Sequence, residues 1–193
     1  MKKLQIEQYL RKLQLNDFEP TVNLATLTKL QDAHLKYIPY ENFDCLNGKI
    51  TSLKRQDMFN KVIMHNRGGI CFELNGLYNW LLESLGFDVT SYSARFIDKM
   101  ETYQLRRHRV MCVALGEKRY LTDVGVNSES PRVPLEIVEG LIQSDGISQY
   151  KFTRSEFWGW LLWQKERGKI WKRLFGFTEE PQIDKDFITA AVA

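Results

Sequence analysis

The chain has 193 residues and a mass of 22.7 kDa, a length that suits one large domain or two small ones. Apolar residues make up 44% of it and aromatic residues 12%, which is enough to build the core of a folded globular protein. Its formal net charge of +3 comes from 27 basic and 24 acidic residues mixed along the chain, so we expect neither nucleic acid nor a membrane as the main partner.

The first half of the chain is predicted to be helical. Apolar residues recur at helical spacing, which predicts helices over residues 4–13, 24–35, 58–64 and 72–85. Pro39 stops the second of these patterns, and Gly86 ends the last one. A turn over residues 66–69 precedes the last helix, and Cys71 stands at the start of that helix.

From Phe87 onward the pattern changes to strands. These are expected over residues 89–97, 110–115, 119–124, 150–153 and 157–164. A turn over residues 116–118 joins the second and third strands as a hairpin, and the later strands could belong to the same barrel or to a sandwich. We therefore predict an α+β fold, with a helical domain over residues 1–86 and a strand-built domain over residues 87–193.

Cys71 is the best candidate for a catalytic residue, because it follows a glycine turn and opens a helix. Backbone N–H groups are unpaired there and the helix dipole is positive, which favours a thiolate. His108 and Asp123 lie within or at the end of strand-like runs, so a fold that brings them to Cys71 would make a Cys-His-Asp relay. In this relay Cys71 attacks a carbonyl carbon to give a thioester, His108 handles the proton and Asp123 orients the imidazole.

The turn before Cys71 would support this chemistry. Gly68 and Gly69 let the chain bend tightly beside the reacting atom, and backbone N–H groups near Cys71 could bind the oxyanion. Arg67 and Glu73 are expected to form a buried pair that braces the turn.

A plainer interpretation stays open on the residues alone, because a cysteine near a helix start is often just a small buried apolar side chain. Cys45 and Cys112 have neither a glycine turn nor a nearby base in the sequence, so they are expected to fill the core. His34 is expected to be a satisfied core histidine, and His65 to interact favourably with a helix C-terminus.

Cysteine usage and hydropathy bear on the location of the protein. Three cysteines at unrelated spacings predict neither a disulfide framework nor a metal site, and they favour a reducing compartment. No apolar run reaches the ~20 residues that are needed to span a bilayer, so the cytoplasm is the expected location.

Three motifs follow one another along the chain: IPYENF at residues 38–43, RGGICFELN at residues 67–75 and LTDVG at residues 121–125. In this order they resemble the arylamine N-acetyltransferases. The tail from Trp171 to Asp186-Phe187 also resembles the end of the family's second lobe. The resemblance implies a helical bundle, a β-barrel-like domain and an α/β lid, around a cysteine-protease-like core formed by Cys71, His108 and Asp123. Because the chain stops at Ala193, we expect the lid to be largely absent.

The resemblance also implies the reaction. Acetyl-CoA, as the acyl donor substrate, would acetylate Cys71, and the acetyl group would pass to the nitrogen of an arylamine or a hydrazine, or to the oxygen of an arylhydroxylamine. The implied partners are these small molecules and CoA, and no metal is implied. Without the lid, hydrolysis of the thioester would be favoured over transfer of the acetyl group to the acceptor. Exposed apolar surface would favour a homo-oligomer.

Four more residues are expected to contact substrate. Tyr40 offers an aromatic wall to a planar acceptor, and Val126 stands where the family usually has an aromatic residue in the acceptor pocket. Gln104 and Leu105 stand where family members often line the substrate and CoA cleft. Two other functions stay open: an acyl-CoA thioesterase or cysteine hydrolase on the same relay, and a catalytically impaired relative that acts as a binding module.

Overall fold

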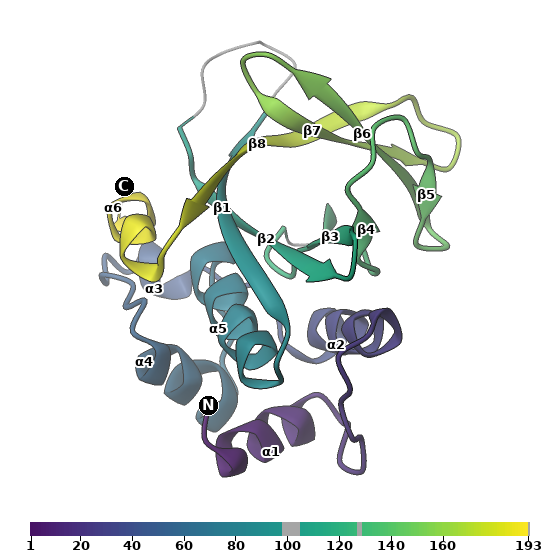
Figure 1. Ribbon diagram of the computed structural model, residues 1–193. Helices are drawn as coiled ribbons and strands as arrows, with labels where there is room; N and C mark the ends of the chain where they lie inside the picture. The colour runs from purple at the N-terminus through teal and green to yellow at the C-terminus, as the bar shows by residue number, and fades with distance from the viewer. Residues whose placement is uncertain (98–104, 127–128, 193) are drawn as a thin grey trace.

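The first half of the chain is helical, as predicted (Figure 1). The computed structural model describes residues 1–97, 105–126 and 129–192. The helices before the sheet are α1 (Lys3–Lys12), α2 (Leu24–Tyr37), α3 (Phe43–Leu46), α4 (Arg55–Phe59), the π-helix η1 (Asn60–Met64) and α5 (Cys71–Ser84). Gly86, with a φ of +91°, follows the end of α5 as expected. The helix predicted over residues 58–64 is longer, because α4 continues directly into η1.

Eight strands of the described residues form one antiparallel sheet. They are β1 (Asp88–Phe96), β2 (His108–Leu115), β3 (Lys118–Thr122), β4 (Leu135–Glu136), β5 (Gln143–Ser144), β6 (Ser148–Ser155), β7 (Gly159–Glu166) and β8 (Lys172–Gln182). Their order, β4-β3-β2-β1-β8-β7-β6-β5, curls into a near-closed barrel (Figure 1). An isolated bridge between Glu139 and Phe152 links the segment after β4 to β6. Of the two predicted architectures, the barrel is confirmed and the sandwich is wrong.

The strand β8 has no counterpart among the predicted strands, although it lies between β1 and β7 in the middle of the sheet. Gly176 and Pro181 give residues 172–182 a poor strand propensity. The structure accommodates them because the pairing with β1 shifts register between Tyr92 and Ala94. After β8 the chain forms the 3-10 helix η3 (Asp184–Phe187) and the short helix α6 (Ile188–Val192), which lie beside the helical half (Figure 1).

Helix α5 lies inside the molecule, since 11 of its 14 residues are buried. Its apolar side chains belong to one cluster with α1, α2 and α4, and this cluster also includes Met111 and Val113 of β2. A second cluster, which includes Phe152 and Phe175, fills the barrel. The first cluster therefore crosses residue 86, and the division of the chain into residues 1–86 and 87–193 stays a prediction. None of the described helices has the length and apolar character needed to traverse a bilayer.

Candidate active site

The N-terminus of α5 is anchored by the segment around Tyr40, so two of the three motifs lie side by side. Tyr40 and Gly69 form a parallel bridge, and the Glu41 N–H donates to the Gly69 carbonyl at 3.0 Å. A Cβ on Gly68 would stand only 2.0 Å from the Pro39 carbonyl oxygen. The glycine is therefore needed for this close approach of two backbones.

Charged side chains brace the same turn, but not in the predicted pairing. Glu73 accepts from the Ile70 N–H at 3.0 Å and from Lys61 Nζ at 2.8 Å. Arg67 instead pairs with Glu41, at 2.7 Å between Nη2 and Oε1. The predicted pair of Arg67 and Glu73 is thus wrong, because Glu73 turns back to cap its own helix and meets a lysine of the π-helix.

His108 and Asp123 lie close together because β2 and β3 pair as a hairpin. His108 is the first residue of β2 and Asp123 follows the last residue of β3. His108 Nε2 and Asp123 Oδ2 are 2.7 Å apart, and both side chains are fully buried. The rings of Phe96 and Phe175 lie against the imidazole, with centroid distances of 5.1 and 5.3 Å. The imidazole is therefore held by one carboxylate inside an aromatic setting.

Two residues that sequence reasoning left out hold Asp123 in place. Asn75, one turn after Cys71 on α5, donates to Asp123 Oδ1 at 2.8 Å and accepts from the Val124 N–H at 2.9 Å. The Gly125 N–H donates to the same carboxylate oxygen at 2.8 Å, and a Cβ on Gly125 would stand 2.8 Å from Cys71 Cα. The spacing of four residues from Cys71 to Asn75 was the available signal, because it places both on one helix face.

Cys71 lies next to the backbone that leads into His108. Its Sγ donates to the Arg107 carbonyl at 3.6 Å, and the residue is 8% exposed. His108 Nδ1 is buried and makes no hydrogen bond within the described residues. Burial disfavours a charged imidazole, but the Asp123 carboxylate and the nearby Cys71 thiol outweigh it and raise the pKa of His108 to about 10. The site can therefore hold an imidazolium beside the sulfur at neutral pH.

The residues expected to contact substrate have different settings. Burial, together with the nearby Cys71 and Cys45 thiols, raises the pKa of Tyr40, whose side chain is partly exposed. Val126 is 6% exposed and packs in the barrel cluster, whereas Leu105 is 59% exposed. Gln104 lies outside the described residues. Substrate contact by these four residues stays a prediction.

Of the three other residues that were expected in the core, Cys112, Cys45 and His34, two differ from expectation. Cys112 is buried in β2, as expected, and burial raises its pKa to about 11. Cys45 is exposed, so the prediction that it fills the core is wrong. His34 is a fully buried core histidine, as expected. Neither of its ring nitrogens has a hydrogen-bond partner among the described residues, so the expectation that both are hydrogen-bonded is wrong.

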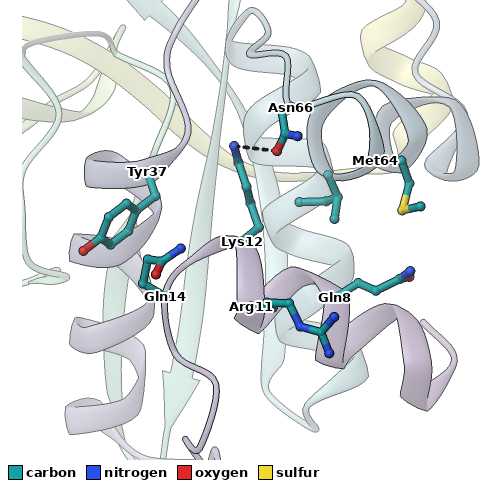
Figure 2. Close-up of a pocket in the computed structure, with 8 residues that line it drawn as sticks. Gln8, Arg11, Lys12, Gln14, Tyr37, Met64 and Asn66 are labelled. Carbon is teal, nitrogen blue, oxygen red and sulfur yellow. Dashed lines mark hydrogen bonds between the residues drawn. The ribbon is translucent and has the colours of Figure 1, made fainter.

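A separate pocket of about 410 Å³ lies where the C-terminal ends of α1, α2 and η1 meet (Figure 2). Lys12 Nζ reaches Asn66 Oδ1 at 3.1 Å there, and Arg11 lines the same pocket. Cations near three helix C-termini are favoured by the helix dipoles, which accounts for both side chains. The hydrogen bond from Lys12 thus ties α1 to Asn66, the first residue of the turn before Cys71. Within the described residues no cluster of three or more His, Cys, Asp and Glu side chains is arranged to hold a metal ion.

Comparisons with known proteins agree on one family. Residues 23–192 match the sequence profile of the N-acetyltransferase family. The chain is 35% identical over 180 residues to the arylamine N-acetyltransferase of Mycolicibacterium smegmatis, an alignment that covers 90% of this chain and 64% of that protein. It is 31% identical over 168 residues to the arylamine N-acetyltransferase of Escherichia coli K12, with 86% and 59% covered. The chain thus spans about three-fifths of the length of these two relatives.

Solved structures give the same result. The M. smegmatis arylamine N-acetyltransferase superposes with a TM-score of 0.90 at 32% identity, over 96% of this chain and 69% of that chain. The Mycobacterium marinum arylamine N-acetyltransferase, solved in complex with CoA, superposes with a TM-score of 0.89 at 26% identity, over 96% of this chain and 69% of that chain.

Proposed function

Because the chain belongs to the arylamine N-acetyltransferase family, we propose that Cys71 takes an acetyl group from acetyl-CoA and passes it to the nitrogen of an arylamine or a hydrazine, or to the oxygen of an arylhydroxylamine. The observation that carries this proposal is the 2.7 Å contact between His108 Nε2 and Asp123 Oδ2 beside the Cys71 thiol. A carboxylate that fixes one ring nitrogen leaves the other nitrogen available for the sulfur. The CoA complex of the M. marinum relative supports the choice of donor.

The first half-reaction loads the cysteine. The Cys71 sulfur attacks the acetyl carbonyl carbon, and a new C–S bond forms while the proton of the thiol resides on His108. The backbone N–H groups of Cys71 and Phe72 precede the first hydrogen bond of α5, which the Glu73 N–H donates to the Ile70 carbonyl, so these two groups stabilise the negative charge on the carbonyl oxygen. As the bond between the acetyl carbon and the CoA sulfur breaks, His108 returns its proton to that sulfur and CoA leaves as a thiol.

The second half-reaction removes the acetyl group from Cys71. The amine nitrogen attacks the thioester carbonyl, and His108 Nδ1 accepts the proton that the nitrogen loses. When the bond from the acetyl carbon to Cys71 breaks, the same proton returns to the Cys71 sulfur. Asp123 stabilises the imidazolium in both halves, through its hydrogen bond to His108 Nε2.

Intact-mass spectrometry with acetyl-CoA tests this proposal. The wild-type chain should gain one acetyl group, and an aminobenzoate or a hydrazide should remove it and speed the release of CoA. Cys71→Ala should gain no acetyl group. Release of CoA that no amine accelerates would point to a thioesterase or hydrolase instead, and a chain that never becomes acetylated would point to a binding module.

A further inference from the structure

We propose that Asp184 and Phe187, in the turn of η3 after β8, are positioning residues that hold Cys71 and His108 against each other. This inference rests on the proposed function of those two residues. No side chain of this turn belongs to the proposed triad. The turn contacts Arg109, the neighbour of His108, and Phe72, the neighbour of Cys71.

Arg109 connects this turn to His108. It follows His108 in β2, and only 2% of it is exposed. Its Nη1 lies 2.9 Å from Asp184 Oδ1, its Nη2 donates to Ser91 Oγ at 2.9 Å, and its guanidinium stands 4.7 Å from the centroid of the Phe187 ring. A buried guanidinium depends on such partners, because an unpaired charge in the interior is strongly unfavourable.

The same turn reaches the neighbour of Cys71. Phe187 is 1% exposed, and its ring centroid lies 5.8 Å from that of Phe72, the residue after Cys71. Arg109 also touches α5 directly, since its carbonyl accepts from Asn75 Nδ2 at 2.6 Å. The turn therefore packs on the start of α5 and on the start of β2 at once.

A second ion pair fixes the turn from the other side. Asp184 Oδ2 lies 2.9 Å from Arg55 Nε of α4, and Arg55 Nη1 lies 2.9 Å from Glu83 of α5. Two carboxylates and two guanidinium groups thus balance one another across α4, α5, β2 and η3. Loss of the Asp184 charge would leave the buried cation of Arg109 without its carboxylate. The placement of β2 against α5, and with it the approach of His108 to Cys71, would suffer.

The three cysteines of the chain provide the test. Cys71 reports on the site, exposed Cys45 serves as the reference, and buried Cys112 reports on the integrity of the fold. We would measure the rates of iodoacetamide labelling of each cysteine by peptide mass spectrometry between pH 6 and 9. The variants are Asp184→Asn, Asp186→Asn as the matched control, and His108→Gln as the reference for a site without the imidazole. Asp186 lies in the same turn, and its carboxylate accepts the Ile183 N–H at 2.8 Å.

We expect Asp184→Asn to lower the ratio of Cys71 to Cys45 labelling at least about fivefold and to shift its pH profile towards that of His108→Gln. Asp186→Asn should leave the ratio within about twofold, because its carboxylate is not the one that pairs with Arg109. An unchanged ratio and pH profile in Asp184→Asn, with Cys112 still protected, would overturn the inference. If Asp184→Asn exposes Cys112, the milder Phe187→Leu is judged by the same ratio and the same criterion.

The labelling experiment uses no acyl donor, so it separates this inference from the proposed function. A chain that takes no acetyl group from acetyl-CoA but loses Cys71 labelling in Asp184→Asn would refute the acetyl transfer and keep the positioning role. A chain that becomes acetylated but keeps its ratio of Cys71 to Cys45 labelling in Asp184→Asn would support the acetyl transfer and refute the positioning role.

Discussion

The imidazole of His108 has a different partner on each side. Nε2 meets the Asp123 carboxylate at 2.7 Å, and Nδ1, which has no hydrogen bond within the described residues, is left for the Cys71 sulfur. Asp123 in turn is fixed by Asn75 and the Gly125 N–H. In the proposed mechanism the reactivity of the Cys71 sulfur therefore depends on a chain of contacts that starts at α5, passes through the loop after β3 and returns to α5.

The first prediction concerns the reactivity of the thiols. At pH 7 iodoacetamide should label Cys71 about tenfold faster than Cys45, although Cys71 is buried and Cys45 is exposed. The reason is the positive charge of His108 beside the Cys71 sulfur. Peptide mass spectrometry of briefly labelled protein gives both rates in one sample. In His108→Gln the order should reverse, and an unreversed order would mean that the imidazole does not activate the thiol.

The second prediction concerns Gly125. An alanine there would place its Cβ 2.8 Å from Cys71 Cα and 2.8 Å from Asn75 Nδ2, so the loop that carries Asp123 must move away from α5. We expect a loss of at least about tenfold in the rate of Cys71 acetylation, because displacements of this kind disturb the reacting geometry. Stopped-time intact-mass measurements with acetyl-CoA would show it. The matched control is Gly116→Asn, at a hairpin position with a φ of +63° and no atom within 4 Å of an added Cβ.

At the residue scale, the sequence identifies groups that carry a local chemical signal. Cys71 is recognisable by its glycine turn and its helix start, His108 and Asp123 are candidates from their places in strand-like runs, and the resemblance supports all three. The spacing from Cys71 places Asn75 on the same helix face, but it does not reveal the partner of Asn75, because Asp123 is 48 residues away. The predicted partner of Glu73 is wrong for a different reason: the partner in the structure, Lys61, lies in a π-helix, and apolar spacing does not distinguish a π-helix from an α-helix.

At the element scale, the start of α5 is held by charges from three other segments. Lys61 of η1 lies 2.8 Å from Glu73 and 2.9 Å from Asp44 of α3, while Arg67 of the turn pairs with Glu41. The hydrogen bond from Lys61, opposed by partial burial and helped by Arg67, lowers the pKa of Asp44 to about 2. The π-helix thus places one lysine where two carboxylates meet beside the turn before Cys71.

The third prediction follows from this arrangement. Lys61→Met should lower the free energy of unfolding by about 2–3 kcal/mol, because it leaves the buried carboxylate of Glu73 without its cation. The side chains of Lys61 and Glu73 are only 17% and 4% exposed, so solvent screens this pair weakly. Urea denaturation followed by circular dichroism would measure the change. Lys36→Met removes the exposed pair with Asp32 and should cost less than about 0.5 kcal/mol.

Elements whose apolar periodicity continues without a break are the ones that the sequence predicts well. Helix α5 and the hairpin of β2 and β3 are of this kind, and they position all three residues of the proposed triad. Strand β8 is not, since Gly176, Pro181 and a register shift interrupt its pattern. Its place between β1 and β7 depends on pairing over long sequence distances, which local propensity does not encode.

At the scale of the whole molecule, two fully buried histidines respond to pH in opposite ways. Burial lowers the pKa of His34 to about 3, since its ring lies between Tyr9 and Tyr78 without a charged partner among the described residues. Burial acts against the charge on His108 too, but there the Asp123 carboxylate and the nearby Cys71 thiol outweigh it and raise the pKa to about 10. Both groups titrate near pH 6.5 in an unfolded chain.

The fourth prediction is a maximum of stability near pH 6.5. Below pH 6.5, His34 is protonated in the unfolded chain but stays neutral in the folded chain until about pH 3. Stability therefore falls as the pH falls. Above pH 6.5, folded His108 keeps a proton that the unfolded chain has lost, so the stability it contributes is full below pH 6.5 and is lost as the pH rises towards about 10. Each slope is at most about 1.4 kcal/mol per pH unit.

Chemical denaturation of the wild-type chain at about pH 5 to 8, a range that ends before the buried Cys112 thiol contributes a slope of its own, would measure this curve. Adding His34→Leu should flatten the acidic side alone, because it removes the group that charges only on unfolding. Adding His108→Gln should flatten the alkaline side alone, since no proton is then held beside Asp123. An alkaline slope that survives His108→Gln would show that another group carries it, and would remove the charged imidazole on which the activation of Cys71 depends.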